Sequence, residues 1–434
     1  MIGALSDTLT QARQAQLTRF AAARHRARGR MHSPVSAGNT AFACLFAAQA
    51  GLLTLSPILP DVARDFGVST AAAGQLRTLV GLVGGIVALA VMLVGRRVGL
   101  RRLLLAGNVL LVLGSVSSAA APGLIVLAAA QVAVGAATGL LIAGGLAAAA
   151  SWAPAERRAA TLAWASLGQP ASRVAGMPLI GMTADLGWRY AWLGVPLVAG
   201  VVGLAAVGSR PRKRPISTRA RPAYLLRWDA KLAGWTIGEV LSYAGWGGAL
   251  VYAGALLVES YDLSPGTVGL LLGAAAIAAF PGNFLARRWL SGSARELLVV
   301  LGLSAAAITA IFGTVRPGPV VSAATFTLLV LVACTRTVAG STFALYVTPE
   351  RRLAVMGVRA STGQLGYLLG GGVGGAALAA GGYPALCLTL AGLFALGTAP
   401  HVAALLAERA VLRAPSPGSR TAATSGRAKR SGAW

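Results

Sequence analysis

The sequence predicts an all-α, polytopic membrane protein whose twelve transmembrane helices form two pseudo-symmetric six-helix bundles. The observations behind this prediction are the composition, the apolar segments and an internal repeat. The 434 residues are 56% hydrophobic and only 12% charged, with a mean hydropathy of +0.70, whereas a soluble domain carries about 25% charged residues. This composition excludes a disordered chain and almost any water-soluble enzyme.

Twelve apolar segments are each long enough to cross a bilayer, which takes about 20 helical residues. They are residues 38–60, 72–94, 103–121, 124–150, 159–184, 190–208, 232–258, 266–285, 297–315, 318–346, 356–380 and 384–406. Their apolar residues run on without the two-residue alternation of a lipid-facing strand. Each segment is therefore predicted to be a helix.

The basic residues are concentrated on one side of this predicted topology. The formal net charge of +26 comes from 38 Lys and Arg against 12 Asp and Glu. Most basic residues lie in the chain ends, the central loop and the even-numbered connections, whereas the opposite connections hold only Arg64, Arg189 and Arg316. This bias predicts that both termini are cytoplasmic, in a bacterial-type plasma membrane. Since orientation accounts for the charge, we expect the lipid bilayer and not nucleic acid as partner.

The second half of the sequence repeats the first at an offset of 195 residues. Gly107 matches Gly302, Gly145 matches Gly340, and the Pro-Gly pair at 122–123 matches the pair at 317–318. Six segments repeated in the same orientation predict two parallel bundles related by an axis along the membrane normal, with a binding site between them.

The expected organisation has five parts. They are a basic cytoplasmic tail (1–37), an N-terminal six-helix bundle (38–208), a cytoplasmic linker (209–231), a C-terminal six-helix bundle (232–408) and a disordered cytoplasmic tail (409–434). Met31 stands just before the first segment and is an alternative start. The three cysteines lie in apolar segments and no metal-ligand spacing exists, so we expect neither metal nor cofactor.

Three motifs carry a family resemblance. The exit from the first segment is ILPDVARDFGVS (58–69), the connection after the second is GRRVGLRR (95–102), and the fifth segment ends in GMPLIG (176–181). The chain resembles a major facilitator superfamily transporter, and more narrowly the drug:proton antiporter and sugar-efflux permease branch. The resemblance implies roles for Arg97, Gly99 and Arg101 in the connection and for Gly176, Pro178 and Gly181 in the fifth segment.

The sequence also departs from that branch. The first Gly and the Asp of the connecting motif are replaced by Met92 and Arg96. The branch places an arginine in the fourth segment where this chain has Gln131, and an acidic residue in the first segment near Leu52. Proton coupling through the usual residues is therefore not predicted by the resemblance.

Five ionisable residues lie inside the apolar segments, where a charge costs roughly 2.5–3.5 kcal/mol and marks a candidate functional site. They are Arg77, Arg173, Glu239, Arg336 and Arg359. Arg77 and Arg359 lie near segment ends, where such side chains can reach the interface, so a structural role is expected for both. Glu239 and Arg336 lie at comparable depth, which predicts an ion pair with either a coupling or a structural role.

Aromatic residues flank the single deep carboxylate. Trp235, Glu239, Ser242 and Trp246 follow i, i+4, i+7, i+11 spacing and share one helical face. The two tryptophans favour an apolar cation through cation–π contact, or serve as an interfacial anchor and core packing. The excess of arginine over glutamate makes an anionic or polyhydroxylated substrate equally plausible.

We expect a secondary transporter of a small organic molecule, working as a monomer by rocker-switch alternating access and exporting its substrate against protons. The candidate binding or coupling residues are Glu239, Arg336, Arg173, Trp235, Trp246 and Gln131. The alternatives are an uncoupled uniporter, an organic-anion or sugar exchanger, and a non-transporting membrane receptor or accessory subunit. An enzyme is not expected, because no His/Asp/Glu cluster lies within the segments.

Overall fold

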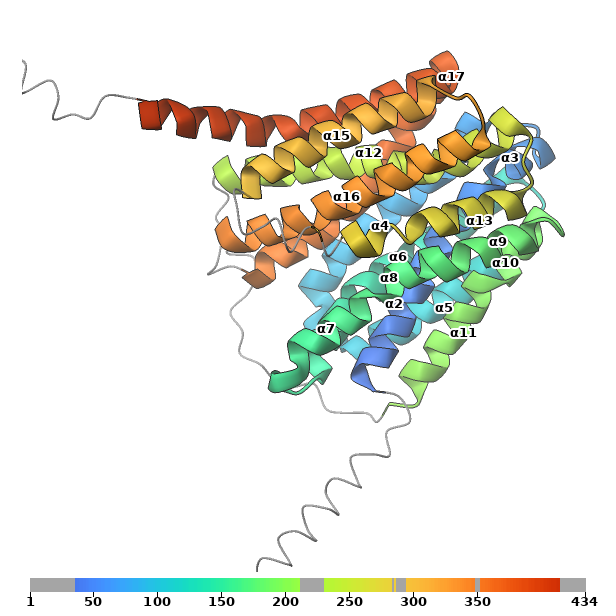
Figure 1. Ribbon diagram of the computed structural model, residues 1–434. Coiled ribbons are helices and arrows are strands. Elements are labelled where there is room, and N and C mark those ends of the chain that lie inside the picture. The colour runs from blue at the N-terminus through green and yellow to red at the C-terminus, as the bar shows by residue number, and fades with distance from the viewer. Residues whose placement is uncertain (1–35, 211–229, 283–284, 286–293, 348–351, 414–434) are drawn as a thin grey trace, which may run out of the picture.

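The computed structural model describes residues 36–210, 230–282, 285, 294–347 and 352–413, and every regular element in these ranges is helical (Figure 1). The predicted tails and linker, and the alternative start at Met31, lie wholly or mostly outside the described residues. The first elements are α2 (Ala37–Leu53), α3 (Leu55–Asp65), α4 (Thr70–Val98), α5 (Leu100–Ala119), α6 (Leu124–Trp152), η1 (Ala155–Arg157), α7 (Arg158–Ser166), α8 (Gly168–Ala171), the π-helical η2 (Ser172–Gly176), α9 (Met177–Ala184), α10 (Trp188–Leu193) and α11 (Val195–Gly208). The remaining elements are α12 (Ala230–Tyr261), α13 (Pro265–Ala276), α15 (Ala294–Thr314), α16 (Pro319–Val347) and α17 (Arg352–Arg413).

Within the described residues, ten helices are long and apolar enough to cross a membrane. The fifth predicted segment is not one of these ten, because it is divided among α7, α8, η2 and α9. The last two predicted segments form the single 62-residue α17, whose backbone leaves helical geometry at Gly381 and Gly382. The helical pieces therefore fit twelve crossings, although the count of twelve stays a prediction.

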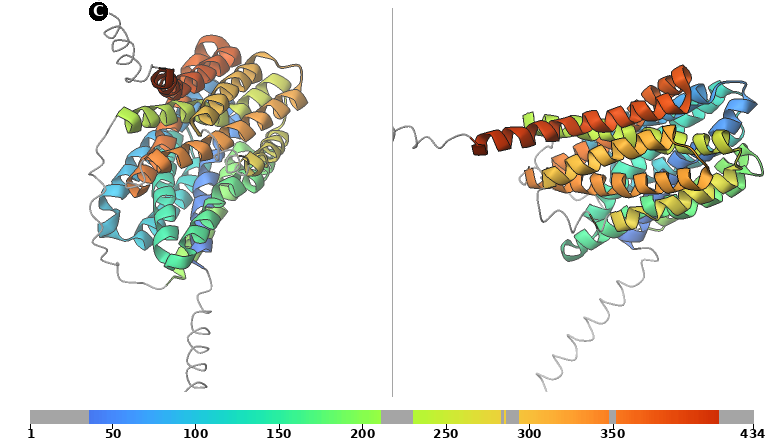
Figure 2. Two further views of the ribbon diagram at one scale, coloured as in Figure 1. Left: turned by 60° about the vertical axis from the view of Figure 1, so that its left-hand side comes forward. Right: turned by 45° about the horizontal axis from the view of Figure 1, so that its top comes forward.

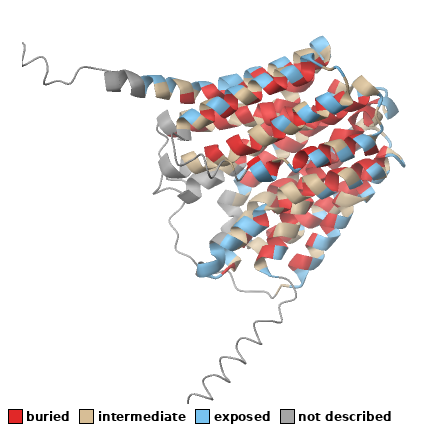
Figure 3. Cartoon of the chain, in the orientation of Figure 1, coloured by how far each residue is buried: buried red, intermediate tan, exposed pale blue. Residues whose placement is uncertain are grey.

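The outward faces of the helices are apolar and exposed, while the inward faces are buried (Figure 3). On α4, for example, Leu82, Ile86 and Leu89 expose 43%, 59% and 46% of their surface, and Ile125 on α6 exposes 87%. Soluble proteins rarely expose contiguous apolar surface of this extent. The molecule is therefore surrounded by lipid and spans the membrane several times.

The long helices run side by side in all views, and those before the linker pack mainly with one another (Figure 2). Here the N-terminal half means α2–α11 and the C-terminal half means α12–α17. Within the N-terminal half α6 packs on α2, α4 and α5, and within the C-terminal half α12 and α15 pack on α17. The two halves contact each other mainly through α4 with α17, α9 with α13, and α3 with α12.

Small residues bring the two halves into close contact. A Cβ on Gly269 of α13 would lie 2.6 Å from the Met177 carbonyl oxygen and 3.0 Å from the Gly181 Cα. On the other side of the molecule, a Cβ on Gly371 of α17 would lie 2.9 Å from the Thr78 hydroxyl on α4. Because the glycines carry no side chain, the two halves come into close contact at both places.

Polar contacts join the halves at the end of the molecule with few arginines, where α3, α10 and α13 have their outer ends. Asp185 accepts a hydrogen bond of 2.8 Å from the Gly266 amide. Nearer the middle of the molecule, the Ser56 hydroxyl donates to the Leu250 carbonyl at 2.8 Å. Glu259 accepts from Thr70 of the opposite half. Toward the arginine-rich end the halves diverge (Figure 1). The structure therefore shows one conformation, closed at the arginine-poor end.

Replacing Gly269 with alanine is expected to force α9 and α13 apart, because the new methyl group meets backbone rather than a movable side chain. Overpacking of this kind costs about 1–3 kcal/mol. The melting temperature in detergent should fall by a few degrees, measured with a thiol-reactive dye that reports exposure of the three buried cysteines. Gly392→Ala is the matched control, since nothing lies within 4 Å of its Cβ. Equal melting temperatures for the two variants would contradict close contact at Gly269.

Candidate functional site

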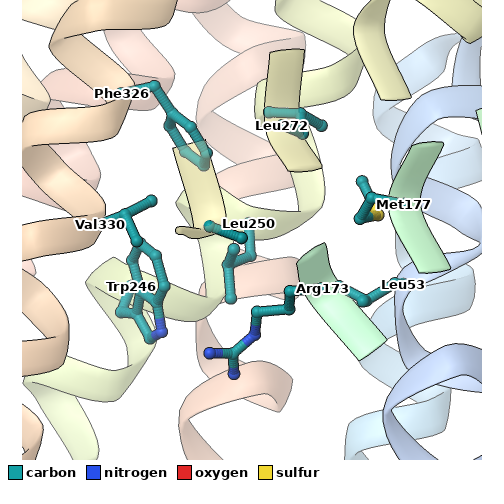
Figure 4. A pocket seen from close by; sticks show the side chains of 9 residues that line it. Leu53, Arg173, Met177, Trp246, Leu250, Leu272, Phe326 and Val330 are labelled. Atoms are coloured by element: carbon teal, nitrogen blue, oxygen red, sulfur yellow. The ribbon is translucent and has the colours of Figure 1, made fainter. Parts of the chain in front are cut away.

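A cavity lies between the two halves, about midway along the helices. Its wall is formed by Leu53, Arg173, Met177, Trp246, Leu250, Leu272, Ala276, Phe326 and Val330 (Figure 4). The residues come from α2, η2 and α9 on one side and from α12, α13 and α16 on the other. Its volume of about 20 Å³ holds about one water molecule. An organic ligand therefore requires the halves to separate.

Arg173 is the charged group of this cavity, and its backbone lies in the π-helical turn η2. Pro170, just before the turn, has no N–H to continue the α-helical hydrogen bonds, which favours a local change of helix type. The guanidinium points into the cavity toward Trp246 (Figure 4). Among the described residues it has no hydrogen-bond or ion-pair partner.

The wall opposite Arg173 is aromatic. The rings of Trp246 and Phe326 are stacked with their centroids 6.4 Å apart, and Phe312 lies behind Phe326 at 5.5 Å. Both Trp246 and Phe326 are almost fully buried. This wall presents flat apolar surface suited to an aromatic or aliphatic body.

A second, smaller cavity adjoins the first and shares Leu53 and Leu250 with it. Arg77 lines this cavity and is only 3% exposed. Its guanidinium lies 4.5 Å from the centre of the Tyr367 ring, and its Nη1 donates to no described atom. The expectation that Arg77 can reach the membrane interface was therefore wrong.

Glu239 and Arg336 form the ion pair expected from their similar depth. Their Oε1 and Nη1 atoms are 3.0 Å apart, and the two side chains are 0% and 2% exposed. Arg359 approaches the other carboxylate oxygen at 3.7 Å. The cluster lies inside the C-terminal half, between α12, α16 and α17. One buried carboxylate is thus shared by two guanidinium groups.

Arg359 was also expected to be able to reach the interface, and this too was wrong. Its Nε donates to the Ser341 hydroxyl at 2.8 Å, and its guanidinium lies 4.4 Å from the centre of the Tyr243 ring and donates to that hydroxyl. Tyr243 follows Glu239 by four residues on the same face of α12. This i, i+4 spacing was the available sequence signal for Tyr243.

Gly340 makes room for the buried carboxylate, since a Cβ there would lie 2.5 Å from the Glu239 Oε1. In the N-terminal half its repeat partner Gly145 packs instead against the Leu45 side chain. At the same offset, Arg336 corresponds to Leu141, which is completely buried. The C-terminal half therefore carries an ion cluster where the N-terminal half has leucine packing.

His401 joins this region, although sequence reasoning did not single it out. It is 3% exposed, its ring meets Phe343 edge-on at 5.7 Å, and its Nε2 has no described partner. Of the three histidines it is the one inside a predicted segment, and that position was the signal for it.

The other candidates lie apart from the cavity. The Trp235 indole donates to the Gly340 carbonyl at 3.1 Å, so this residue supports the ion cluster. The Gln131 amide donates to Ser118 at 2.9 Å inside the N-terminal half. Trp246 is therefore the only tryptophan of the predicted stripe that lines the cavity within the described residues.

The two motifs have packing roles in the structure. Arg101 donates to the Gly208 carbonyl at 3.0 Å, and Gly99 has a φ of 85°, which favours glycine. The side chain of Arg97 lies outside the described part. Pro178 contacts Gly273, and Gly181 contacts α13, while Gly176 packs beside Ser172 and Val195 in its own half.

Comparisons with known proteins agree with this architecture. A model of the Major Facilitator Superfamily matches residues 41–233 and 235–433. No curated protein sequence matches the chain.

Solved transporter structures share the fold. A D-xylose–proton symporter superposes with a TM-score of 0.66 at 17% identity, covering 84% of this chain and 96% of the symporter. A variant of the nucleoside transporter NupG gives 0.65 at 13% identity, covering 85% and 99%. An inward-facing, unoccupied bacterial homologue of the lysosomal transporter Spinster gives 0.61 at 14% identity, covering 85% and 93%. The chain belongs to the Major Facilitator Superfamily, and it is a multi-pass secondary transporter of small molecules rather than an enzyme.

Proposed function

We propose that this transporter exports a small organic molecule in exchange for protons, and that Glu239 is the proton-carrying group. The main support is that Glu239, the single carboxylate within the predicted segments, is fully buried and lies between Arg336 and Arg359. A buried ion pair of this kind holds three helices together in one charge state. Protonation of Glu239 removes the negative charge and leaves both guanidinium groups unpaired.

The loss of this pair is transmitted to the cavity through α12. Glu239 and Trp246 are seven residues apart on one face of this helix, which corresponds to about 10 Å along its axis. A shift of α12 against α16 and α17 therefore moves Trp246 and Leu250 in the cavity wall. Substrate binding and protonation thus both change the position of α12, and such a shared element is what coupled transport requires.

The conformational change is a rocking of one half against the other. The glycine contacts of α9 with α13 and of α4 with α17 allow this movement, and the polar contacts of Glu259 and Asp185 break when the arginine-poor end opens. We assign the arginine-rich end to the cytoplasm of a bacterial-type cell, with both termini there. The direction of export rests on the resemblance of the fifth-segment motif to that of antiporters. The protein works as a monomer.

An uncoupled uniporter is the second candidate, and one observation favours it. The N-terminal half has the uncharged Leu52 and Gln131 at the two positions where the antiporter branch carries charges, and Gln131 is hydrogen-bonded to Ser118 within its own half. In that case Glu239 and Arg336 only hold the C-terminal helices together.

Glu239→Gln separates these two candidates. The amide keeps the shape of the side chain but cannot exchange a proton, so we expect downhill exchange to continue while uptake driven by a pH gradient is lost. Proteoliposomes with an imposed pH gradient and a panel of organic anions, sugars and lipophilic cations measure both fluxes. Glu156→Gln changes an exposed carboxylate in η1 and is the matched control. A parent protein that shows downhill exchange but no gradient-driven uptake would favour the uniporter, and full gradient-driven transport by Glu239→Gln would rule out Glu239 as the proton-carrying group.

A comparison of single and double variants tests whether the pair is more than structural. Glu239→Leu leaves two buried guanidinium groups without their carboxylate, a loss of about 3–5 kcal/mol. The double variant Glu239→Leu/Arg336→Leu replaces the pair with apolar side chains, as Leu141 does at the repeat position of Arg336, so we expect its melting temperature to lie closer to that of the parent protein. The double variant should still lack pH-driven flux. Retained coupling in the double variant would assign the pair a purely structural role.

A further inference from the structure

The Arg173 guanidinium is a charge without a counter-charge in the middle of the molecule. Within the described residues it has no hydrogen-bond or ion-pair partner, and its Nε is fully enclosed. A lone cation at this depth is costly, and such residues persist where they meet a ligand. The N-terminal half offers no carboxylate to it: the acidic residues described there, Asp61, Asp65, Asp185 and Glu156, lie at helix ends or in η1.

The neighbouring charges add to the positive field. Arg77 lines the adjoining cavity with an unpaired Nη1, and the two cavities share Leu53 and Leu250. None of the described residues lining either cavity is acidic. Glu239 is engaged by Arg336 and Arg359, so it does not neutralise the cavity arginines. An organic cation would therefore enter a site that repels it.

The remaining wall specifies the body of the ligand. The Arg173 guanidinium points toward Trp246, and Phe326, stacked with Trp246, lines the same cavity together with Leu250 and Val330 (Figure 4). A planar guanidinium binds a carboxylate through two parallel hydrogen bonds, while the aromatic wall accepts a flat apolar ring. A small inorganic anion would leave this wall without contact.

We infer that the cavity binds an organic anion with an aromatic or apolar body, its acidic group held by Arg173 and its body packed on Trp246 and Phe326. The inference rests on the proposed transport function only for the separation of the halves that enlarges the cavity. It names the substrate class of that site. Because Arg173 has no hydrogen-bond or ion-pair partner among the described residues, we assign its charge to ligand binding and not to stability.

Binding can be measured without any gradient, on the full-length protein in lipid nanodiscs by calorimetry. The probes are 2-naphthoate, its neutral amide 2-naphthamide, and the cation 2-naphthylmethylammonium, which share one ring system. We expect naphthoate to bind at least about 10-fold more tightly than the amide, since a hydrogen bond to a charged group is worth about that factor. The ammonium compound should not bind. Equal binding of all three, or preference for the cation, would overturn the inference.

Variants place the anion on Arg173. Arg173→Gln should weaken naphthoate binding by about 10-fold or more, and Arg173→Lys by less, because lysine keeps the charge but loses the planar fork. Arg316→Gln is the matched control, since Arg316 donates to Ser260 at the arginine-poor end. The melting temperature of ligand-free Arg173→Gln should be unchanged or higher. A large loss of stability with unchanged naphthoate affinity would assign Arg173 a structural role and overturn the inference.

Two further measurements test the ligand class. Trp246→Ala should weaken the binding of naphthoate but not that of acetate. If chloride displaces naphthoate at equal concentration, the cavity is instead a site for inorganic anions. Glu239→Gln should bind naphthoate as the parent protein does. Naphthoate binding without proton-coupled flux would therefore reject proton coupling and leave this inference standing.

Discussion

The structure depends on one constraint: a charged side chain inside a membrane is costly unless an opposite charge or a bound ligand compensates it. The predicted segments hold four arginines and one glutamate. Glu239 lies between Arg336 and Arg359, so the C-terminal half contains a nearly dry ion cluster. Arg77 and Arg173 are left over, and both line cavities between the halves. The distribution of charge thus separates a group that holds helices together from groups that face a ligand.

The two halves have diverged within one architecture. Gly145 and Gly340 occupy equivalent places, yet one packs on Leu45 and the other on the Glu239 carboxylate. Leucine packing in a bundle does not change with pH, whereas an ion pair can be broken by a proton. The N-terminal half contributes the cation of the cavity through η2, and the C-terminal half contributes the aromatic wall and the ion cluster. Helix α12 carries residues of both, which makes it the natural link between them.

Small residues make many of the close contacts between the halves, beside larger pairs such as Arg77 and Tyr367. Gly181 meets Gly269, and Gly371 meets Thr78, so the helices approach without interlocking side chains. Interfaces of this kind rely on van der Waals contact and a few hydrogen bonds, because lipid offers no hydrophobic driving force for helix association. The contacts that join the arginine-poor end are single polar bonds such as Asp185 to Gly266, which can be exchanged for others at modest cost.

Much of the fold followed from the sequence, because helices in a bilayer satisfy their own backbone and reveal themselves as long apolar segments. The repeat predicted two related bundles. The similar depth of Glu239 and Arg336 predicted an ion pair, because depth in the membrane follows from counting residues along a helix. The direction in which a side chain faces does not follow from such a count. Arg77 and Arg359 point inward, although their short distance from the segment ends suggested that they reach the interface. The sequence by itself therefore determined the helices and the depth of each charge. Only the tertiary structure decided which charges meet, because partners such as Arg359 and Glu239 come from distant helices whose facing sides are set by packing.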